Sequence, residues 1–218
     1  MESSSPESSS RTVLPAPNCV IAPNWETARL LMALRAGDEA VARPLWLRYA
    51  PSVTRIIRRT LGPRAAIDQV LHQVFCLVFH EGRRLEQGAD LNLFVLRAVA
   101  RAAQAFLRRR VLRWLHSVAR SRRRVDASAG FAAPQPTESV LRFYRVLDHL
   151  GARDRVAFAL HFIERLNIRE VAAAIGESPV RAARRLRRCL ATVLVGIKGD
   201  PVLTRLGKSG IPGAGDTA

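Results

Sequence analysis

Apolar residues recur at helical spacing along most of this chain, and turn-forming residues interrupt the pattern at intervals. The first helical pattern begins at Trp25 and stops at Gly37, after which Asp38 opens a second pattern that runs to about residue 61. Pro51 lies inside this second pattern. Because proline lacks a backbone donor and clashes with the preceding turn, we expect a kink or a break beside it.

Three further patterns complete the chain: a strongly apolar helix over about 65–80, a long helix or two abutting ones over 91–119, and a helical block over 140–195. Cys76 lies in an apolar run and is expected to be a core residue. The segment 199–218 is rich in glycine and proline, so we expect it to fray. We find no convincing strand pattern, and the predicted fold class is therefore all-α.

The helical patterns form two groups, which predicts two small helical domains joined by a flexible basic linker. A stretch without apolar periodicity separates them, and it ends in a run of alanine, proline and glutamine. The expected division is a disordered N-terminal tail (1–24), a first domain (25–119), the linker (120–138), a second domain with a helix-turn-helix (139–197) and a disordered C-terminal tail (198–218).

The charge of the chain indicates a polyanionic partner. Lys and Arg together number 35 against 18 Asp and Glu, which gives a formal net charge of +17. Nucleic acid is the first candidate partner and an anionic membrane surface the second. A basic amphipathic segment around Trp114 would suit a membrane surface, but a surface anchor needs no second helical domain, so we expect no membrane partner.

The cysteines and the N-terminus favour a cytoplasmic location. The three cysteines are widely spaced, which indicates no disulfide framework. The N-terminus lacks the basic start and apolar core of a secretory signal, and no apolar run approaches the ~18 residues of a membrane span.

The most informative stretch is 168–190, which predicts a helix, a tight turn at Gly176 and a second helix that opens at Ser178. The Ser178 hydroxyl can cap the second helix, and Pro179 suits its first position, where no amide donor is needed. Two short helices around such a turn are typical of the helix-turn-helix that lays its second helix on DNA.

Arginines form one face of the second helix, and small or apolar residues form another. The arginines recur at i, i+3, i+4 and i+7 and therefore share one face: Arg181, Arg184, Arg185 and Arg188. The small or apolar residues line another face: Ala182, Leu186, Cys189, Leu190 and Val193. An arginine face suits phosphates and guanine edges. The alternative is a solvated cationic helix face with no ligand.

Four phrases of the sequence carry a resemblance to a known family. They are Gly37-Asp38-Glu39-Ala40-Val41, Tyr49-Ala50-Pro51-Ser52-Val53, the apolar helix 67–75 that ends Val-Phe, and the series from Leu147 through Arg155 and Glu170 to Ser178. In order and spacing, over about residues 28–195, they resemble an extracytoplasmic-function (ECF) sigma factor of the sigma-70 family of bacterial RNA polymerase.

The resemblance implies promoter-specific transcription initiation without enzymatic activity or a cofactor. The first domain would bind the polymerase beta-prime clamp and the minus-ten element, and the second would bind the beta flap and the minus-thirty-five element. The implied partners are core RNA polymerase, promoter DNA and an anti-sigma factor, with no small-molecule substrate. The residues expected to act are Asp68, Gln69, Leu71, His72, Gln73 and Phe75 for polymerase, Phe94, Arg97, Arg101, Arg108 and Arg109 for the minus-ten element, and Ser178, Arg181, Arg184, Arg185, Arg187 and Arg188 for the minus-thirty-five element.

The chain departs from the family pattern in the first domain. Gln69 and Gln73 stand where the polymerase-binding helix usually carries acids, so the charge-assisted part of those contacts is lost. Ala102 and Phe106 stand where the melting segment usually carries Asn and Asp, which removes polar base readers. The alternatives are therefore a sigma-like regulator that does not initiate, and a non-specific arginine-rich nucleic-acid binder.

Other chemistry has little support in the sequence. His72, Cys76 and His80 recur at i, i+4 and i+8, but three ligands on successive turns span too far to converge on one ion, so no metal site is expected. No phosphate-binding glycine loop, nucleophile motif or catalytic carboxylate pair is present, so we expect no enzyme activity.

Overall fold

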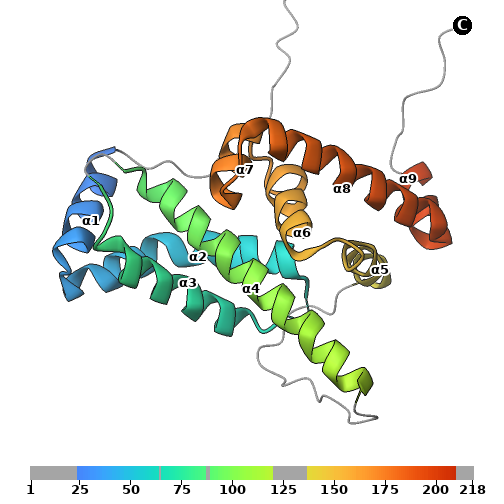
Figure 1. Ribbon diagram of the computed structural model, residues 1–218, viewed down its shortest axis with the longest axis horizontal. Coiled ribbons are helices and arrows are strands. Elements are labelled where there is room, and N and C mark those ends of the chain that lie inside the picture. Colours follow the sequence, from blue (N-terminus) through green and yellow to red (C-terminus); the bar gives the residue numbers. More distant parts are fainter. Residues whose placement is uncertain (1–23, 64, 87–88, 120–136, 210–218) are drawn as a thin grey trace, which may run out of the picture.

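The computed structural model describes residues 24–63, 65–86, 89–119 and 137–209 as an assembly of helices with no strand among them (Figure 1). The predicted all-α class is confirmed. Most of the predicted linker, most of the predicted N-terminal tail and the end of the predicted C-terminal tail lie outside the described residues, and the last linker position, Glu138, begins a helix.

Residues 24–119 form the N-terminal lobe, and residues 137–209 form the C-terminal lobe. The helices of the N-terminal lobe are α1 (Asn24–Ala36), the 3-10 turn η1 (Glu39–Val41), α2 (Ala42–Leu61), α3 (Ile67–Gly82) and α4 (Leu91–Ala119). Those of the C-terminal lobe are α5 (Glu138–Leu147), α6 (Ala152–Phe158), the π-helical turn η2 (Ala159–Ile163), α7 (Ile168–Ile175), α8 (Pro179–Gly199) and α9 (Pro201–Ser209).

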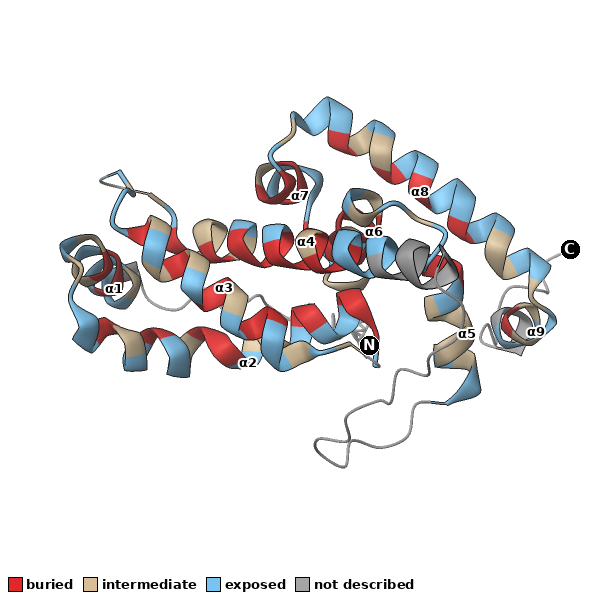
Figure 2. Cartoon of the chain, turned by 60° about the horizontal axis from the view of Figure 1, so that its bottom comes forward, coloured by how far each residue is buried: buried red, intermediate tan, exposed pale blue. Residues whose placement is uncertain are grey.

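α4 is the central helix, because elements of both lobes pack on it. Helices α2 and α3 lie against one side, and α6 and α7 lie against another (Figures 1 and 2). Its middle carries five alanines between 98 and 105, and four of them are at most 4 % exposed. Such small side chains let several helices approach the same segment closely, and a helix that is apolar on most sides is typically buried. One cluster of buried residues accordingly runs from α1–α4 into α6, α7 and α8.

A kink or a break was expected beside Pro51, and the break is wrong, because α2 is one helix from Ala42 to Leu61. Proline leaves the carbonyl of the residue four positions earlier, Leu47, without its helical partner. Both Pro51 and Leu47 are exposed, so water can solvate that carbonyl without opening the helix.

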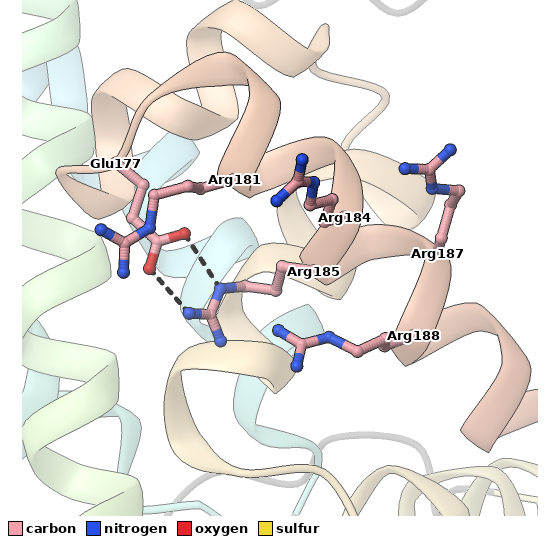
Figure 3. A pocket seen from close by; sticks show the side chains of 6 residues that line it. All are labelled: Glu177, Arg181, Arg184, Arg185, Arg187 and Arg188. Carbon is pink, nitrogen blue, oxygen red and sulfur yellow. Dashed lines mark hydrogen bonds and ion pairs between the residues drawn. The ribbon is translucent and has the colours of Figure 1, made fainter.

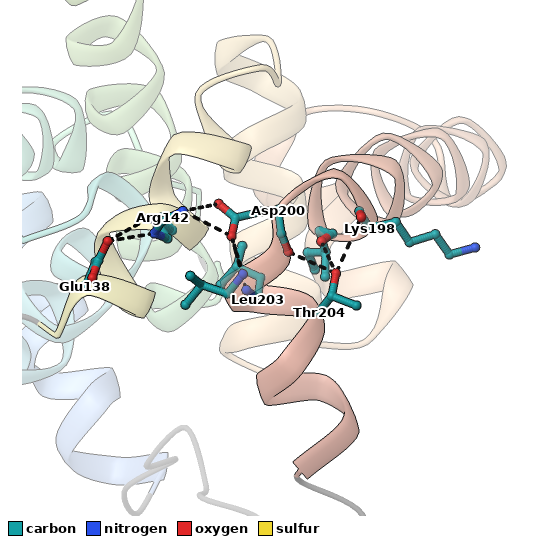
Figure 4. A network of polar contacts seen from close by, with 8 residues as sticks. Glu138, Arg142, Lys198, Asp200, Leu203 and Thr204 are labelled. Atoms are coloured by element: carbon teal, nitrogen blue, oxygen red, sulfur yellow. Dashed lines mark hydrogen bonds and ion pairs between the residues drawn. The ribbon is translucent and has the colours of Figure 1, made fainter.

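The expected fraying after residue 199 is also wrong up to Ser209, because α9 forms there (Figure 4). One Asp200 carboxylate oxygen accepts hydrogen bonds from the Val202 and Leu203 backbone N–H groups, as a helix N-cap does. The Arg142 guanidinium holds the same carboxylate at 3.2 Å, and the Leu203 side chain is buried. A cap and one buried leucine thus outweigh the glycine content of the segment.

Two residues expected in the core are exposed. Cys76 lies on the outer face of α3, while its neighbours Val74, Phe75 and Val78 face inward. Leu190 on α8 is 37 % exposed, although the rest of the predicted apolar seam of α8 is buried. In both cases the residue stands one position beyond the stripe that faces the core.

Candidate nucleic-acid interface

Local caps build the turn between α7 and α8 in the C-terminal lobe. Gly176 has φ of 69°, the left-handed conformation in which glycine avoids the penalty of a side chain, and its N–H donates to the Ala172 carbonyl at the end of α7. The Ser178 hydroxyl oxygen accepts from the Arg181 backbone N–H at 3.4 Å, and Pro179 begins α8. These caps turn the chain within three residues and fix the direction of α8.

The start of α7 is capped as firmly. The Asn167 side-chain oxygen accepts from the Glu170 backbone N–H at 3.0 Å, and the Glu170 carboxylate accepts from the Asn167 backbone N–H at 2.8 Å. This reciprocal capping box satisfies two donors that the first turn of a helix leaves free. It also fixes how α7 leaves the preceding loop.

Five arginines gather at the first half of α8, where with Glu177 they surround one hollow of the surface (Figure 3). Four of them are exposed: Arg181, Arg184, Arg187 and Arg188. Among the described residues, no carboxylate lies within ion-pair distance of these four guanidinium groups. These side chains can reach phosphates or base edges without first breaking an ion pair.

Arg185 differs from its neighbours because two carboxylates hold it. Its guanidinium donates to both oxygens of Glu177, at 3.1 and 2.7 Å, and also pairs with Asp154 on α6. The hydrogen bonds to Glu177 raise the pKa of Arg185, and the same bonds lower the pKa of Glu177. With its side chain only 17 % exposed, Arg185 ties α8 to α6 and to the turn. The sequence pattern placed it on the arginine face but could not reveal these partners.

The arginines expected at the minus-ten element differ along α4 in whether they have a partner. Arg97 donates through Nε to the Ala173 carbonyl of α7 at 2.9 Å, and Arg101 pairs with Glu81 of α3. Arg108 and Arg109 are exposed, and Phe94 is half-buried against the core. Ala102 and Phe106, at the two positions where a loss of polar base readers was expected, are buried core residues, 1 % and 9 % exposed.

The face expected to bind polymerase is also divided. Asp68, Gln69 and His72 are exposed on α3 and Gln73 is half-buried, whereas Leu71 and Phe75 are 8 % and 4 % exposed and belong to the core. The two apolar side chains are therefore covered in this structure. Trp46 of α2, which is 44 % exposed, packs on Phe75 with ring centroids 4.6 Å apart and presents the aromatic surface there instead.

Among the described residues, no group of three or more His, Cys, Asp or Glu side chains could hold a metal ion. Cys76 Sγ lies 3.7 Å from the His72 ring nitrogens, which brings together only two of the three residues considered from the sequence. None of the described helices is long and apolar enough to span a membrane.

Comparison with known proteins shows the fold. No model of a known protein family matches the chain, and no curated protein matches it in sequence. Among solved structures, CnrH in complex with the cytosolic domain of CnrY is similar with a TM-score of 0.57 at 17 % identity, over 80 % of this chain and 98 % of that one. The sigma factor RpoE from Bartonella quintana, in complex with the anti-sigma factor NepR, is similar with a TM-score of 0.53 at 15 % identity, over 72 % of this chain and 97 % of that one. The chain thus has an ECF sigma-like helical fold.

Proposed function

We propose that this protein is a sigma factor of the ECF type, which recruits core RNA polymerase to a restricted set of promoters and leaves the chemistry to the polymerase. The observation that carries the proposal is the exposed arginine face on α8 of a firmly capped helix-turn-helix, within a fold similar to that of the sigma factor RpoE. The partners are core polymerase, promoter DNA and an anti-sigma factor, and the cytoplasm is the place of action.

The division of labour follows the two lobes. The C-terminal lobe places α8 in the major groove of the minus-thirty-five element, where Arg181, Arg184, Arg187 and Arg188 contact phosphates and base edges. Ser178 and Arg185 hold the helix in position. In the N-terminal lobe, the exposed part of α3 binds the polymerase clamp, and the arginines of α4 hold the minus-ten strand.

The experiment that tests this function is reconstitution with purified core polymerase, followed by run-off transcription on a library of genomic fragments. Discrete transcripts from a few fragments would establish the sigma factor and give its promoter. A variant with Arg181, Arg184 and Arg188 replaced by alanine should still bind core polymerase but lose these transcripts, because α8 supplies the promoter contacts in this proposal.

A second candidate is a sigma-like regulator that binds polymerase or DNA without initiating. The observation in its favour is the exposed face of α3, where Gln69 offers no charge and the apolar residues Leu71 and Phe75 are covered. Stable core binding without transcripts would support this candidate. Binding of any DNA with a steep salt dependence and no core binding would instead identify a non-specific nucleic-acid binder.

A further inference from the structure

Four side chains of types that bind metals lie on the outer face of α3, each one turn from the next. They are exposed and recur at i, i+4, i+8 and i+12: Asp68, His72, Cys76 and His80. The opposite face of the helix packs into the core through Val70, Val74 and Val78, which are fully buried. Because the core anchors α3, the helix fixes the spacing of the outer side chains.

The exposure of Cys76 is uncommon, because cysteine is among the most buried residue types. The other described cysteine, Cys189, shows the usual behaviour. It is 2 % exposed and donates to the Asp154 carbonyl at 3.6 Å, and burial raises the pKa of its thiol to about 11. Cys189 is therefore inert, whereas Cys76 contributes nothing to the core and is the thiol that a ligand in solution can reach.

His72 supplies a second ligand at a fitting distance. Of the two histidines one turn from Cys76, only His72 lies within hydrogen-bonding distance of Sγ, with both ring nitrogens at 3.7 Å. In a tetrahedral zinc site the metal–sulfur and metal–nitrogen bonds measure about 2.3 and 2.0 Å, which places the sulfur about 3.5 Å from the nitrogen. A small rotation of these two exposed side chains is therefore enough to hold an ion between them.

The two ligand types select the ion. Thiolate and imidazole favour Zn²⁺, whereas Mg²⁺ and Ca²⁺ prefer oxygen ligands. Three side chains on successive turns are too far apart for one ion, but two side chains one turn apart can share it. Because both residues are exposed, water can occupy the remaining coordination positions.

We infer that His72 and Cys76 form a chelating site for Zn²⁺ on the outer face of α3, with the Asp68 carboxylate one turn away adding negative charge beside the ion. On binding, the Cys76 thiol loses its proton to the solvent, one zinc–sulfur and one zinc–nitrogen bond form, and two waters leave the ion. No electron is transferred, so binding needs no oxidant and is reversible.

Bound zinc would change the face of α3 that we propose to bind polymerase, and this consequence alone rests on the proposed function. His72 belongs to that face and would be occupied by the ion. The ion brings two positive charges and the Cys76 thiolate one negative charge, so the face gains one net positive charge. A face that meets polymerase cations would then bind them less tightly.

The site is tested on the full chain with Cd²⁺, which replaces Zn²⁺ at thiolate sites and gives a sulfur-to-metal charge-transfer band in the ultraviolet. Every protein carries Cys19→Ser, and a phosphine reductant keeps Cys76 reduced. The parent protein should show a saturable band at one ion per chain, and added Zn²⁺ should remove that band by displacing Cd²⁺. Cys76→Ser should lose the band. A band that survives in Cys76→Ser, or that Zn²⁺ does not remove, would overturn the site.

Two matched variants separate the pair from a single thiol. His72→Ala should weaken Cd²⁺ binding at least about tenfold, because the loss of even an outer-shell partner costs about 10–100-fold. His80→Ala removes the histidine on the other side of Cys76 and should leave the affinity unchanged. Both histidines are exposed, and thermal melting without metal shows that each variant folds. An unchanged affinity in His72→Ala, or an equal loss in His80→Ala, would overturn the pair.

The effect on polymerase is measured separately, as affinity for core polymerase with and without Zn²⁺. Zinc should weaken binding of the parent protein about threefold and leave binding of Cys76→Ser unchanged. Equal responses of the two proteins would overturn the effect on polymerase. If neither protein binds core polymerase, the proposed function fails, and the Cd²⁺ titrations alone decide the metal site.

Discussion

The two lobes present their arginines differently. In the C-terminal lobe, four of the five arginines in the first half of α8 are exposed and one is tied down by Glu177 and Asp154. In the N-terminal lobe, Arg97 and Arg101 are exposed but are tied to Ala173 and Glu81, and Arg108 and Arg109 further along α4 are exposed without an ion pair among the described residues. The same residue type at helical spacing thus serves as an open surface in one lobe and largely as a structural connection in the other.

Helical spacing therefore predicts which face of a helix a side chain belongs to, but not whether that face is open to a ligand. On α8 the face borders solvent because the helix packs through its other side on Ala182, Leu186 and Cys189. On α4 the corresponding face meets the other lobe. Four measurements would test this difference between the lobes.

The largest effect is expected from removing the exposed arginines of α8. Replacing Arg181, Arg184 and Arg188 with alanine should weaken duplex binding on the order of a hundredfold and reduce the slope of log affinity against log salt by roughly 2.7, if each contacts one phosphate. Fluorescence anisotropy over a salt series measures both quantities. A matched variant that replaces the exposed Arg29, Arg43 and Arg84 of the N-terminal lobe removes the same charge and should leave the slope unchanged.

A smaller effect is expected on the face of α3 that we propose to bind polymerase. Gln69→Glu together with Gln73→Glu should raise affinity for core polymerase about tenfold, because a carboxylate strengthens each hydrogen bond to a cationic partner. Surface plasmon resonance with immobilised core polymerase gives the affinity, and the neutral pair Gln69→Asn and Gln73→Asn serves as the control. Equal affinities of the two double variants would show that this face does not meet polymerase cations.

The tied arginine of α8 should affect stability rather than binding. Glu177→Gln is expected to lower the free energy of unfolding by about 1–2 kcal/mol at pH 7, because it weakens the bonds to Arg185. The folded-state pKa of Glu177 is lowered, so its contribution is fully present above the ordinary glutamate pKa and is lost as the pH falls through the folded-state value.

Urea unfolding of wild type and Glu177→Gln between pH 7 and pH 3 measures this contribution. The two curves should converge at the acid end, while the salt slope of duplex binding stays the same in both proteins. A loss of salt slope in the variant would mean that Arg185 contacts DNA after all.

The smallest effect concerns the loop before α7. Arg165 has φ of 59°, a left-handed conformation that costs a non-glycine residue roughly 1–2 kcal/mol. Arg165→Gly should therefore raise the free energy of unfolding by about 0.5 kcal/mol after the greater chain entropy of glycine is subtracted. Thermal melting should show a rise of about 1–2 °C. A decrease would mean that the Arg165 side chain makes a stabilising contact.

The sequence predicts best where structure depends on neighbours in the chain. The turn at Gly176, the cap at Ser178 and the first turn at Pro179 could be predicted because each needs only local backbone geometry. The all-α class follows from the apolar periodicity in the same way. The continuity of α2 through Pro51 could not be predicted, because it depends on which side of the helix faces water.

Contacts between distant segments account for the rest. Nothing in the spacing marks Arg155 as buried, since two of its partners are backbone carbonyls more than 90 residues earlier in the chain. Helical periodicity does not state which side of α3 meets α2 and α4. The sequence pattern therefore allowed Leu71 and Phe75 to be placed on a functional face, although both lie in the core. The ion pairs of Arg185 with Glu177 and Asp154 could not be predicted for the same reason, although these partners lie closer to it in the sequence.

The alanine-rich middle of α4 has a consequence for the order in which the protein matures on the ribosome. The N-terminal lobe is made first, at a speed of about 5–20 residues per second, and part of its cover comes from α6 and α7, which are synthesised seconds later. Until then the carbonyls of residues 59–61 at the end of α2 have only water to bind, although the Arg58 carbonyl accepts from the Gly62 N–H, and one side of α4 has no apolar neighbour. The nascent chain therefore exposes an apolar side of α4 for a short time. Because alanine side chains are small, they limit the apolar surface through which the chain could aggregate during that interval.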